Sequence, residues 1–175
     1  MTFDFIRRRR RAARVLVAGV LAVAVMVGSG TPGNAQEPSR SGEQQRNADV
    51  VREAFARGVG GEDSFFSILA DDVHWTVARA VEPTTYTSRA QFLQDGAGPI
   101  QARLVGPIEA HVRELITEGD VVVAIWDGTA TARDGRPYVN SYLWVMTMRD
   151  GKVVRATAFL DLVTLNELLD RVDPI

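Results

Sequence analysis

The most constraining feature of this sequence is a pair of alternating runs within residues 140–161, joined by Asp150-Gly151. Asp-Gly between alternating apolar positions is typical of a β-hairpin with a two-residue loop. With these residues as the loop, Arg149 pairs with Lys152 and every later pair follows. The predicted pairs on one face are Met148–Val153, Met146–Arg155, Trp144–Thr157, Tyr142–Phe159 and Asn140–Asp161. Aromatic residues mid-face and an amide opposite a carboxylate at its end predict a pocket wall with a polar end.

A second Asp-Gly pair, Asp134-Gly135, extends this register to the preceding strand. A two-residue loop there places Thr129 opposite Asn140 and Asp127 opposite Tyr142, whereas a loop two residues longer shifts the pairs but keeps the face. The predicted pocket face carries Asp127, Thr129, Asn140, Tyr142, Trp144, Thr157, Phe159 and Asp161.

The opposite face of these strands is predicted to be small and apolar. It carries Ala124, Trp126, Gly128, Ser141, Leu143, Val145, Ala156, Ala158 and Leu160. Both faces therefore need cover, and a single layer of helices covers only one of them. We expect this outer face to form a homodimer.

Along the rest of the chain, apolar spacing and turn residues predict helices first and a meander of strands afterwards. The predicted helices are 47–57, 62–69, a short one capped at Ser88 and ended near Gly96, and one begun by a capping box at Thr164. The predicted strands are 73–78, with Trp75 inward, then 108–117, 121–132, 138–149 and 153–160. This order predicts an α+β fold with a curved mixed or antiparallel sheet, shaped like a cone, and N-terminal helices packed on its concave face.

The first 35 residues are predicted to be a secretory signal peptide rather than part of the domain. Six arginines between residues 7 and 14 precede an almost unbroken apolar run at 15–27, and small residues lead to Ala35. Cleavage is predicted after Ala35, with export to the cell envelope or medium. The apolar run is shorter than the roughly 20 residues that span a bilayer, so membrane contact is expected only before cleavage, with an uncleaved anchor as the alternative. Residues 36–46 are predicted to be a disordered spacer before the domain at 47–175.

Charge and cysteine usage exclude several classes of function. Residues 1–35 hold six of the 20 Lys and Arg and one of the 22 Asp and Glu, so cleavage leaves 14 basic and 21 acidic residues, a net charge of −7. Such an acidic domain is not suited to binding nucleic acid. The sequence has no cysteine, which excludes disulfides, thiol nucleophiles and cysteine metal sites. We predict no metal and no cofactor.

Asp161 is the first candidate for catalysis, with Asn140 orienting it. The sequence leaves two roles open for Asp161: a helix N-cap, or a general acid/base whose pKa is raised in a partly apolar cavity. The second role requires a free carboxylate, which Thr164 and Glu167 would allow by capping the following helix themselves. The predicted walls of a pocket for a small apolar ligand are Trp75, Tyr142, Trp144 and Phe159, joined by Asp127 and Thr129.

Other polar residues have two interpretations each. Asp127 beside Tyr142 is either a pair that polarises a carbonyl or a carboxylate at a wet sheet edge. His74 and His111 have no assigned role. Arg79, Glu82 and Tyr86 lie in a predicted loop, where they either rim the cavity or are only solvated.

The order of elements resembles the SnoaL-like branch of the nuclear transport factor 2-like superfamily over residues 47–172. The residues that carry the resemblance are the strand 73–77, Asn140-x-Tyr142, the turn 150–154 and the closing Phe159-Leu160-Asp161. The resemblance implies a cone-shaped α+β barrel with a deep apolar pocket, commonly dimeric. It also implies an acid/base role for Asp161, as in polyketide cyclases.

Two positions depart from related enzymes. Phe55 stands in the first helix, where steroid isomerases have a tyrosine, and Phe159 stands where limonene epoxide hydrolases have an arginine. The sequence therefore leaves two functions open. One is a cofactor-free isomerase, cyclase or hydrolase that uses Asp161, and the alternative is a non-catalytic ligand-binding or protein-association module.

Overall fold

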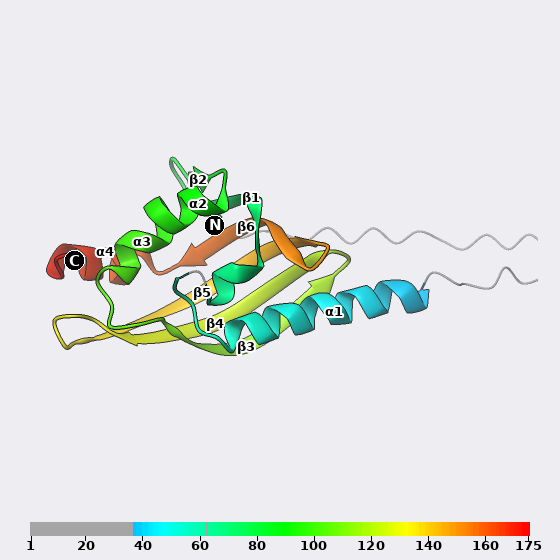
Figure 1. Ribbon diagram of the computed structural model, residues 1–175, viewed down its shortest axis with the longest axis horizontal. Coiled ribbons are helices and arrows are strands. Elements are labelled where there is room, and N and C mark those ends of the chain that lie inside the picture. Colours follow the sequence, from blue (N-terminus) through cyan, green and yellow to red (C-terminus); the bar gives the residue numbers. More distant parts are fainter. Residues whose placement is uncertain (1–36, 62) are drawn as a thin grey trace, which may run out of the picture. The chain divides into compact units, whose positions relative to one another are not determined.

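The computed structural model of the protein describes residues 37–61 and 63–175. Within them lies one sheet of six strands in the order β2-β1-β6-β5-β4-β3 (Figure 1). The strands are β1 (Leu69–Val77), β2 (Thr84–Tyr86), β3 (Glu109–Glu118), β4 (Val121–Thr131), β5 (Pro137–Arg149) and β6 (Lys152–Leu160). The pair β1–β6 is parallel and the other pairs are antiparallel. The predicted signal peptide lies outside the described residues.

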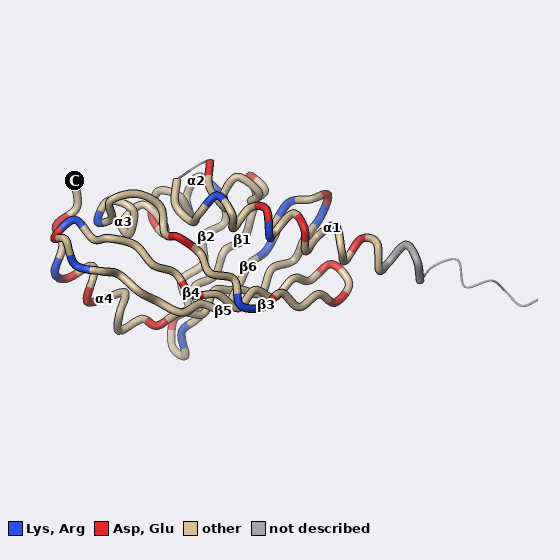
Figure 2. The backbone as a smooth tube through the Cα atoms, turned by 90° about the horizontal axis from the view of Figure 1, so that it is seen from below, with Lys and Arg blue, Asp and Glu red and all other residues tan. Residues whose placement is uncertain are grey.

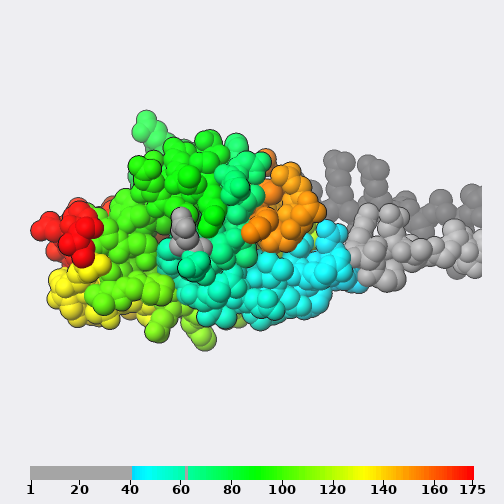
Figure 3. Space-filling view, viewed as in Figure 1, coloured from blue at the N-terminus to red at the C-terminus, as the bar shows by residue number. Residues whose placement is uncertain are grey.

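Helices cover the face of the sheet that we call the inner face, defined by Trp126, Tyr142 and Trp144. The helical segments are α1 (Glu37–Phe55), the 3₁₀ turn η1 (Phe65–Ile68), α2 (Arg89–Gln91), the π-helical η2 (Phe92–Ala97), α3 (Gly98–Gln101) and α4 (Leu162–Arg171). Figure 3 shows α1, η1 and the α2–α3 segment side by side over the sheet. The predicted α+β fold, a curved open sheet with helices on its concave face, is confirmed.

Several element boundaries differ from those predicted. The helix α1 begins at Glu37, so residues 37–46 are helical rather than a disordered spacer. The predicted loop before Ser88 contains the edge strand β2. The helix capped by Ser88 does not end at Gly96, because a π-helical turn carries it through to α3. None of the helices in the described part of the chain is long and apolar enough to cross a membrane.

The hairpin β5–β6 has the predicted turn but a different register beyond it. Asp150 and Gly151 both have positive φ, 53° and 72°, as a two-residue Asp-Gly turn requires. The first predicted pairs, Arg149–Lys152 and Met148–Val153, are confirmed. A bulge between Thr147 and Met148 then shifts the strands by one residue, so Trp144 pairs with Ala158 and Tyr142 with Leu160. Because side chains alternate along a strand, Thr157 and Phe159 lie on the outer face, and their predicted pairing was wrong.

The loop between β4 and β5 is one residue longer than predicted, which also shifts the strand register by one residue. Thr131 pairs with Pro137, and the Ala132 N–H donates to the Arg136 carbonyl at 2.9 Å, which leaves residues 133–135 in the loop. Trp126 therefore pairs with Tyr142 on the inner face. Asp127 and Thr129, predicted to face the pocket, lie on the outer face, because an odd shift reverses every side chain of a strand.

The core is an aromatic cluster between the helices and the inner face. Phe55 of α1 lies 5.2 Å from Trp126 and 5.6 Å from Trp144 between ring centroids. Trp126 and Tyr142 are stacked at 3.9 Å with their planes 8° apart. Such contacts contribute about 0.5–1.5 kcal/mol each beyond burial of area. Gly128 permits this stack, since a Cβ there would lie 3.0 Å from both rings.

Candidate functional site

A cavity of about 270 Å³ opens between the inner face and the helical layer. Its walls come from β1, β4, β5 and β6 on one side, and from η2, α3 and α4 on the other. The side chains that line it are mostly apolar and include Phe66, Trp75, Val77, Phe92, Ile100, Ile108, Trp126, Tyr142, Trp144, Ala158, Leu160, Leu165 and Leu169. Its volume is close to the lower end of typical small-molecule sites, about 300 Å³.

The predicted wall residues Trp75, Tyr142 and Trp144 all line this cavity. Trp75 stacks on Phe92 at 4.4 Å and meets Trp144 edge-on at 4.9 Å. Together with Trp126, every tryptophan of the chain contributes to the lining. The aromatic rings hold one another in place, so the wall is rigid before a ligand arrives.

The wall facing the sheet was not predicted from the sequence. The π-helical turn η2 widens the helix and brings Phe92, Asp95, Gly96 and Ala97 to the cavity. Gly96 is required there, because a Cβ would lie 2.8 Å from the Phe92 ring and 3.0 Å from the Tyr86 ring. The paired glycines at 96 and 98 were the only sequence signal, and they were interpreted as the end of the helix. π-helical turns are rare and occur frequently at functional sites.

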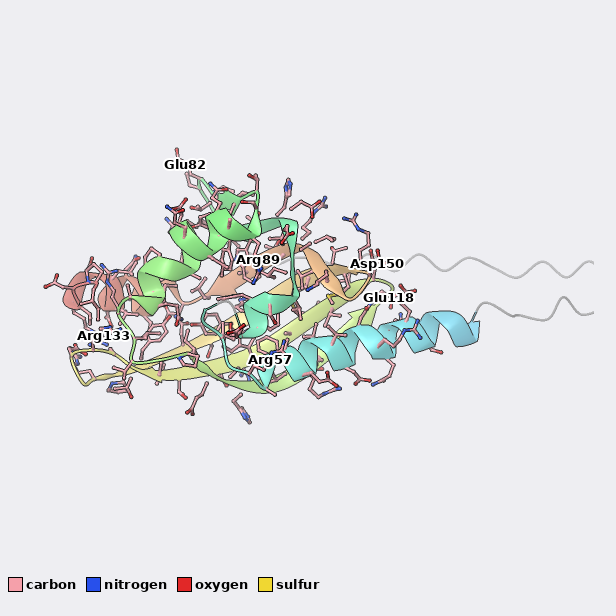
Figure 4. The ribbon with its side chains drawn as sticks, viewed as in Figure 1. Arg57, Glu82, Arg89, Glu118, Arg133 and Asp150 are labelled. Carbon is pink, nitrogen blue, oxygen red and sulfur yellow. The ribbon has the colours of Figure 1, made fainter. Side chains whose placement is uncertain are left out.

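Charged groups lie only at the edge of the cavity, within the described lining. They are Arg79 and Asp95, and both are exposed. The half-buried Tyr86 also lines the cavity and is affected by both charges. Partial burial and the Asp95 carboxylate raise the pKa of Tyr86, and Arg79 partly offsets this. Arg79 and Tyr86 thus rim the cavity, as one interpretation of the sequence held. Glu82 does not line it, and Figure 4 shows Glu82 at the outer tip of its loop.

Asn140 and Asp161 are neighbours, as predicted, but they meet through the Asp161 backbone. Asn140 Nδ2 donates to the Asp161 carbonyl at 3.0 Å, and the Asp161 N–H donates to Asn140 Oδ1 at 3.1 Å. Asn140 Nδ2 also donates to the Tyr138 hydroxyl at 3.1 Å, and that hydroxyl lies 3.1 Å from the Tyr142 hydroxyl. This arrangement ties the end of β6 to β5 and so positions α4, whose Leu165 lines the cavity.

The Asp161 carboxylate is the N-cap of α4 and does not line the cavity. It accepts hydrogen bonds from the Val163 and Thr164 N–H groups and from the Thr164 hydroxyl, at 2.8, 3.3 and 2.9 Å. These bonds, that of the Thr164 hydroxyl first, hold the pKa of Asp161 below its usual value. Of the two roles that the sequence left open for Asp161, the N-cap is confirmed and the acid/base with a raised pKa is not. The prediction that Thr164 caps the helix was wrong, because the cap lies three residues earlier.

The other predicted wall residues lie on the outer face. Phe159 is 49% exposed there, and Thr129 is exposed as well. Asp127 accepts a hydrogen bond from Ser141 at 2.6 Å and lies 3.3 Å from Arg113 Nε. Asp127 therefore does not meet Tyr142, and because β4 lies between β3 and β5, it stands on the outer face of an interior strand rather than at a sheet edge. His74 and His111 are exposed, and His111 pairs with Asp127 across β3 and β4.

Trp126 carries a buried donor that sequence reasoning missed. Its Nε1 atom is buried and has no hydrogen-bond partner among the described residues. The same holds for Asn47 Nδ2. Unpaired buried donors are rare in native structures. Within the same described residues, no three His, Asp or Glu side chains come together as metal ligands.

The model of the SnoaL-like domain family matches residues 51–156. This chain belongs to the SnoaL-like family. The predicted membership of the SnoaL-like branch is thereby confirmed. The SnoaL-like match covers β1 to β5 and most of β6, hence most of the cavity wall. No curated protein matches the sequence.

Solved structures share the fold of this SnoaL-like domain at low sequence identity. A candidate isomerase from Bacillus subtilis has a TM-score of 0.60 at 16% identity, covering 73% of this chain and 95% of its own. A candidate SnoaL-like polyketide cyclase from Jannaschia has a TM-score of 0.60 at 18% identity, with coverages of 77% and 98%. TerC, co-crystallised with polyporic acid, has a TM-score of 0.56 at 23% identity, with coverages of 71% and 98%.

Proposed function

We propose that this SnoaL-like domain binds a small, flat and largely apolar molecule in its cavity. The observation that carries the proposal is an aromatic cavity of about 270 Å³ with charged side chains only at its edge. Flat ligands gain both apolar burial and ring contacts from such walls. The co-crystal of TerC with polyporic acid supports small-molecule binding in a similar fold.

The hydrogen bonds of Asp161 favour binding over catalysis by this residue. Its carboxylate accepts three hydrogen bonds from the first turn of α4, so acid/base chemistry would require it to leave the cap. Its lowered pKa keeps it ionised near neutral pH, where a general acid must hold a proton. We therefore assign Asp161 and Asn140 to positioning α4, and we place the proposed function on the cavity.

The test compares two substitutions on adjacent residues of β6. Ala158 lines the cavity, whereas Thr157 points to the outer face. Titration of the protein with tetralin, a flat hydrocarbon, is followed by calorimetry and by tryptophan emission. We expect A158F to weaken binding at least tenfold, because its ring fills the space, and T157F to bind as the original protein does. Equal binding by both variants, each shown to be folded by circular dichroism, would place the site elsewhere.

We propose that the domain acts after export, with residues 1–35 removed. The arginine block and apolar run of that segment support this. Expression of the full chain in a bacterial host, followed by N-terminal sequencing, tests it. Gln36 is the expected first residue, and an intact Met1 would contradict the proposal.

We also propose a homodimer through the outer face. Ile125, Leu143 and Val145 are only half-buried there, and Val139 and Phe159 are 56% and 49% exposed. Contiguous exposed apolar surface is typical of protein interfaces. Charges are interspersed along the described chain without a continuous basic stripe (Figure 2), which favours a protein partner over nucleic acid.

A further inference from the structure

The hydrogen bonds behind the cavity wall have a definite direction, which begins at Asn140. Its Oδ1 accepts from the Asp161 N–H and its Nδ2 donates to the Asp161 carbonyl. Exchanging the amide nitrogen and oxygen would set donor against donor and acceptor against acceptor, so the orientation of this buried amide is determined. The other hydrogen of Nδ2 therefore points to the Tyr138 oxygen.

The next hydrogen bond joins the Tyr138 and Tyr142 hydroxyl groups, and Tyr138 is its favoured donor. Tyr138 is 2% exposed, and its oxygen already accepts a hydrogen bond from Asn140. Its own proton has one acceptor within reach among the described residues, the Tyr142 oxygen at 3.1 Å. If Tyr142 donated instead, the Tyr138 proton would have no acceptor, which is costly because Tyr138, unlike Tyr142, does not line the cavity. The favoured order is Asn140 to Tyr138 to Tyr142.

The Tyr142 proton is then left without an acceptor in the described chain, while Tyr142 lines the cavity and is 7% exposed. Resting on the proposed function, we infer that the Tyr142 hydroxyl donates to the ligand, and that the ligand carries a carbonyl oxygen on its apolar framework. Two contacts position and polarise the Tyr142 hydroxyl as a donor. Its ring is held by the stack on Trp126 at 3.9 Å, and the Tyr138 proton polarises its oxygen.

A neutral carbonyl fits this donor better than a carboxylate does. Burial of its hydroxyl raises the pKa of Tyr142, so the phenol stays protonated. Arg79, the one cation of the described lining, lies at the exposed edge. A carboxylate placed near Tyr142 would be desolvated without a positive partner, which is unfavourable. A ketone loses much less hydration and gains the hydrogen bond.

The experiment compares two ligands that differ by one oxygen, α-tetralone and tetralin, in the original protein and in Y142F. Dissociation constants are measured by calorimetry. On going to Y142F we expect the tetralone to lose about 3- to 10-fold in affinity relative to tetralin, the size of one neutral hydrogen bond. The carbonyl stretching band of bound tetralone, measured in the original protein, is expected at lower frequency than in a hydrocarbon solvent.

A second variant, Y138F, tests the direction of the hydrogen bonds. It keeps the Tyr142 donor but removes the group that polarises it, so the preference for the ketone is expected to fall less than in Y142F. If both ligands bind but Y142F leaves their affinity ratio unchanged, or the carbonyl band is unshifted, the inference is overturned and the proposed function stands. If neither ligand binds the original protein, both are overturned.

Discussion

Replacement of Asn140 by Ala tests whether this residue holds α4 against the sheet. The side chain makes three hydrogen bonds, to the Tyr138 hydroxyl, the Asp161 carbonyl and the Asp161 N–H, at 3.0–3.1 Å. Each contributes about 1 kcal/mol net, so N140A is expected to lower the free energy of unfolding by about 3 kcal/mol. For a domain of this size, about 3 °C per kcal/mol gives a melting temperature lower by roughly 10 °C.

Urea unfolding followed by tryptophan fluorescence measures this change. The matched control is S141A, the next residue on β5, which points to the outer face and donates one hydrogen bond to Asp127. As an exposed group it is expected to cost less than about 1 kcal/mol. A loss below 1 kcal/mol for N140A, or an equal loss for both variants, refutes the positioning role. Unchanged stability with abolished ligand binding would show instead that Asn140 acts on the ligand.

Three further changes are expected to have separable effects. G128A places a Cβ 2.7 Å from Ile108 Cγ2, so overpacking should cost about 1–3 kcal/mol in urea unfolding, and a loss below about 0.5 kcal/mol would contradict the close packing. F159S should convert the proposed dimer to a monomer in sedimentation velocity while leaving tetralin affinity unchanged, and a persistent dimer would exclude this part of the face. The lowered pKa of Asp161 means that its contribution to stability is present above the usual carboxyl pKa and is lost as pH falls through the lowered value. D161N, which still caps α4, should therefore show a flatter loss of urea midpoint between about pH 5 and pH 2, and an unaltered acid profile would argue against the cap.

Local sequence signals determined the element types and the turns. The Asp150-Gly151 turn needed residues that tolerate positive φ, and both adopt it. The Ser88 cap was predicted because a serine oxygen can accept the N–H of the residue three positions on, and it accepts that of Gln91 at 3.1 Å. The order of helices and strands then led to the α+β class and the SnoaL-like family, since these depend on periodicity rather than on exact pairing.

The sequence also brought Asn140 and Asp161 together, at the far end of the hairpin. It did not show how they meet, because residue types alone do not reveal whether a carboxylate or its backbone faces the amide. An aspartate before a helix is by residue type an N-cap, and the structure gives Asp161 that role. The capping box at Thr164 was a competing signal of the same kind, and the cap in the structure is Asp161.

Only the tertiary structure decided which side chains face the cavity. One bulged residue in β6 and one extra residue in the loop at 133–135 moved Phe159, Asp127 and Thr129 outward and Trp126 inward. A strand alternates with period two, so a single-residue error reverses a whole face, and nothing in local propensity measures it. The register follows from packing large rings against α1 and η2 while charged groups stay in water. The cavity, and the direction of the hydrogen bonds that reach Tyr142, are consequences of that packing.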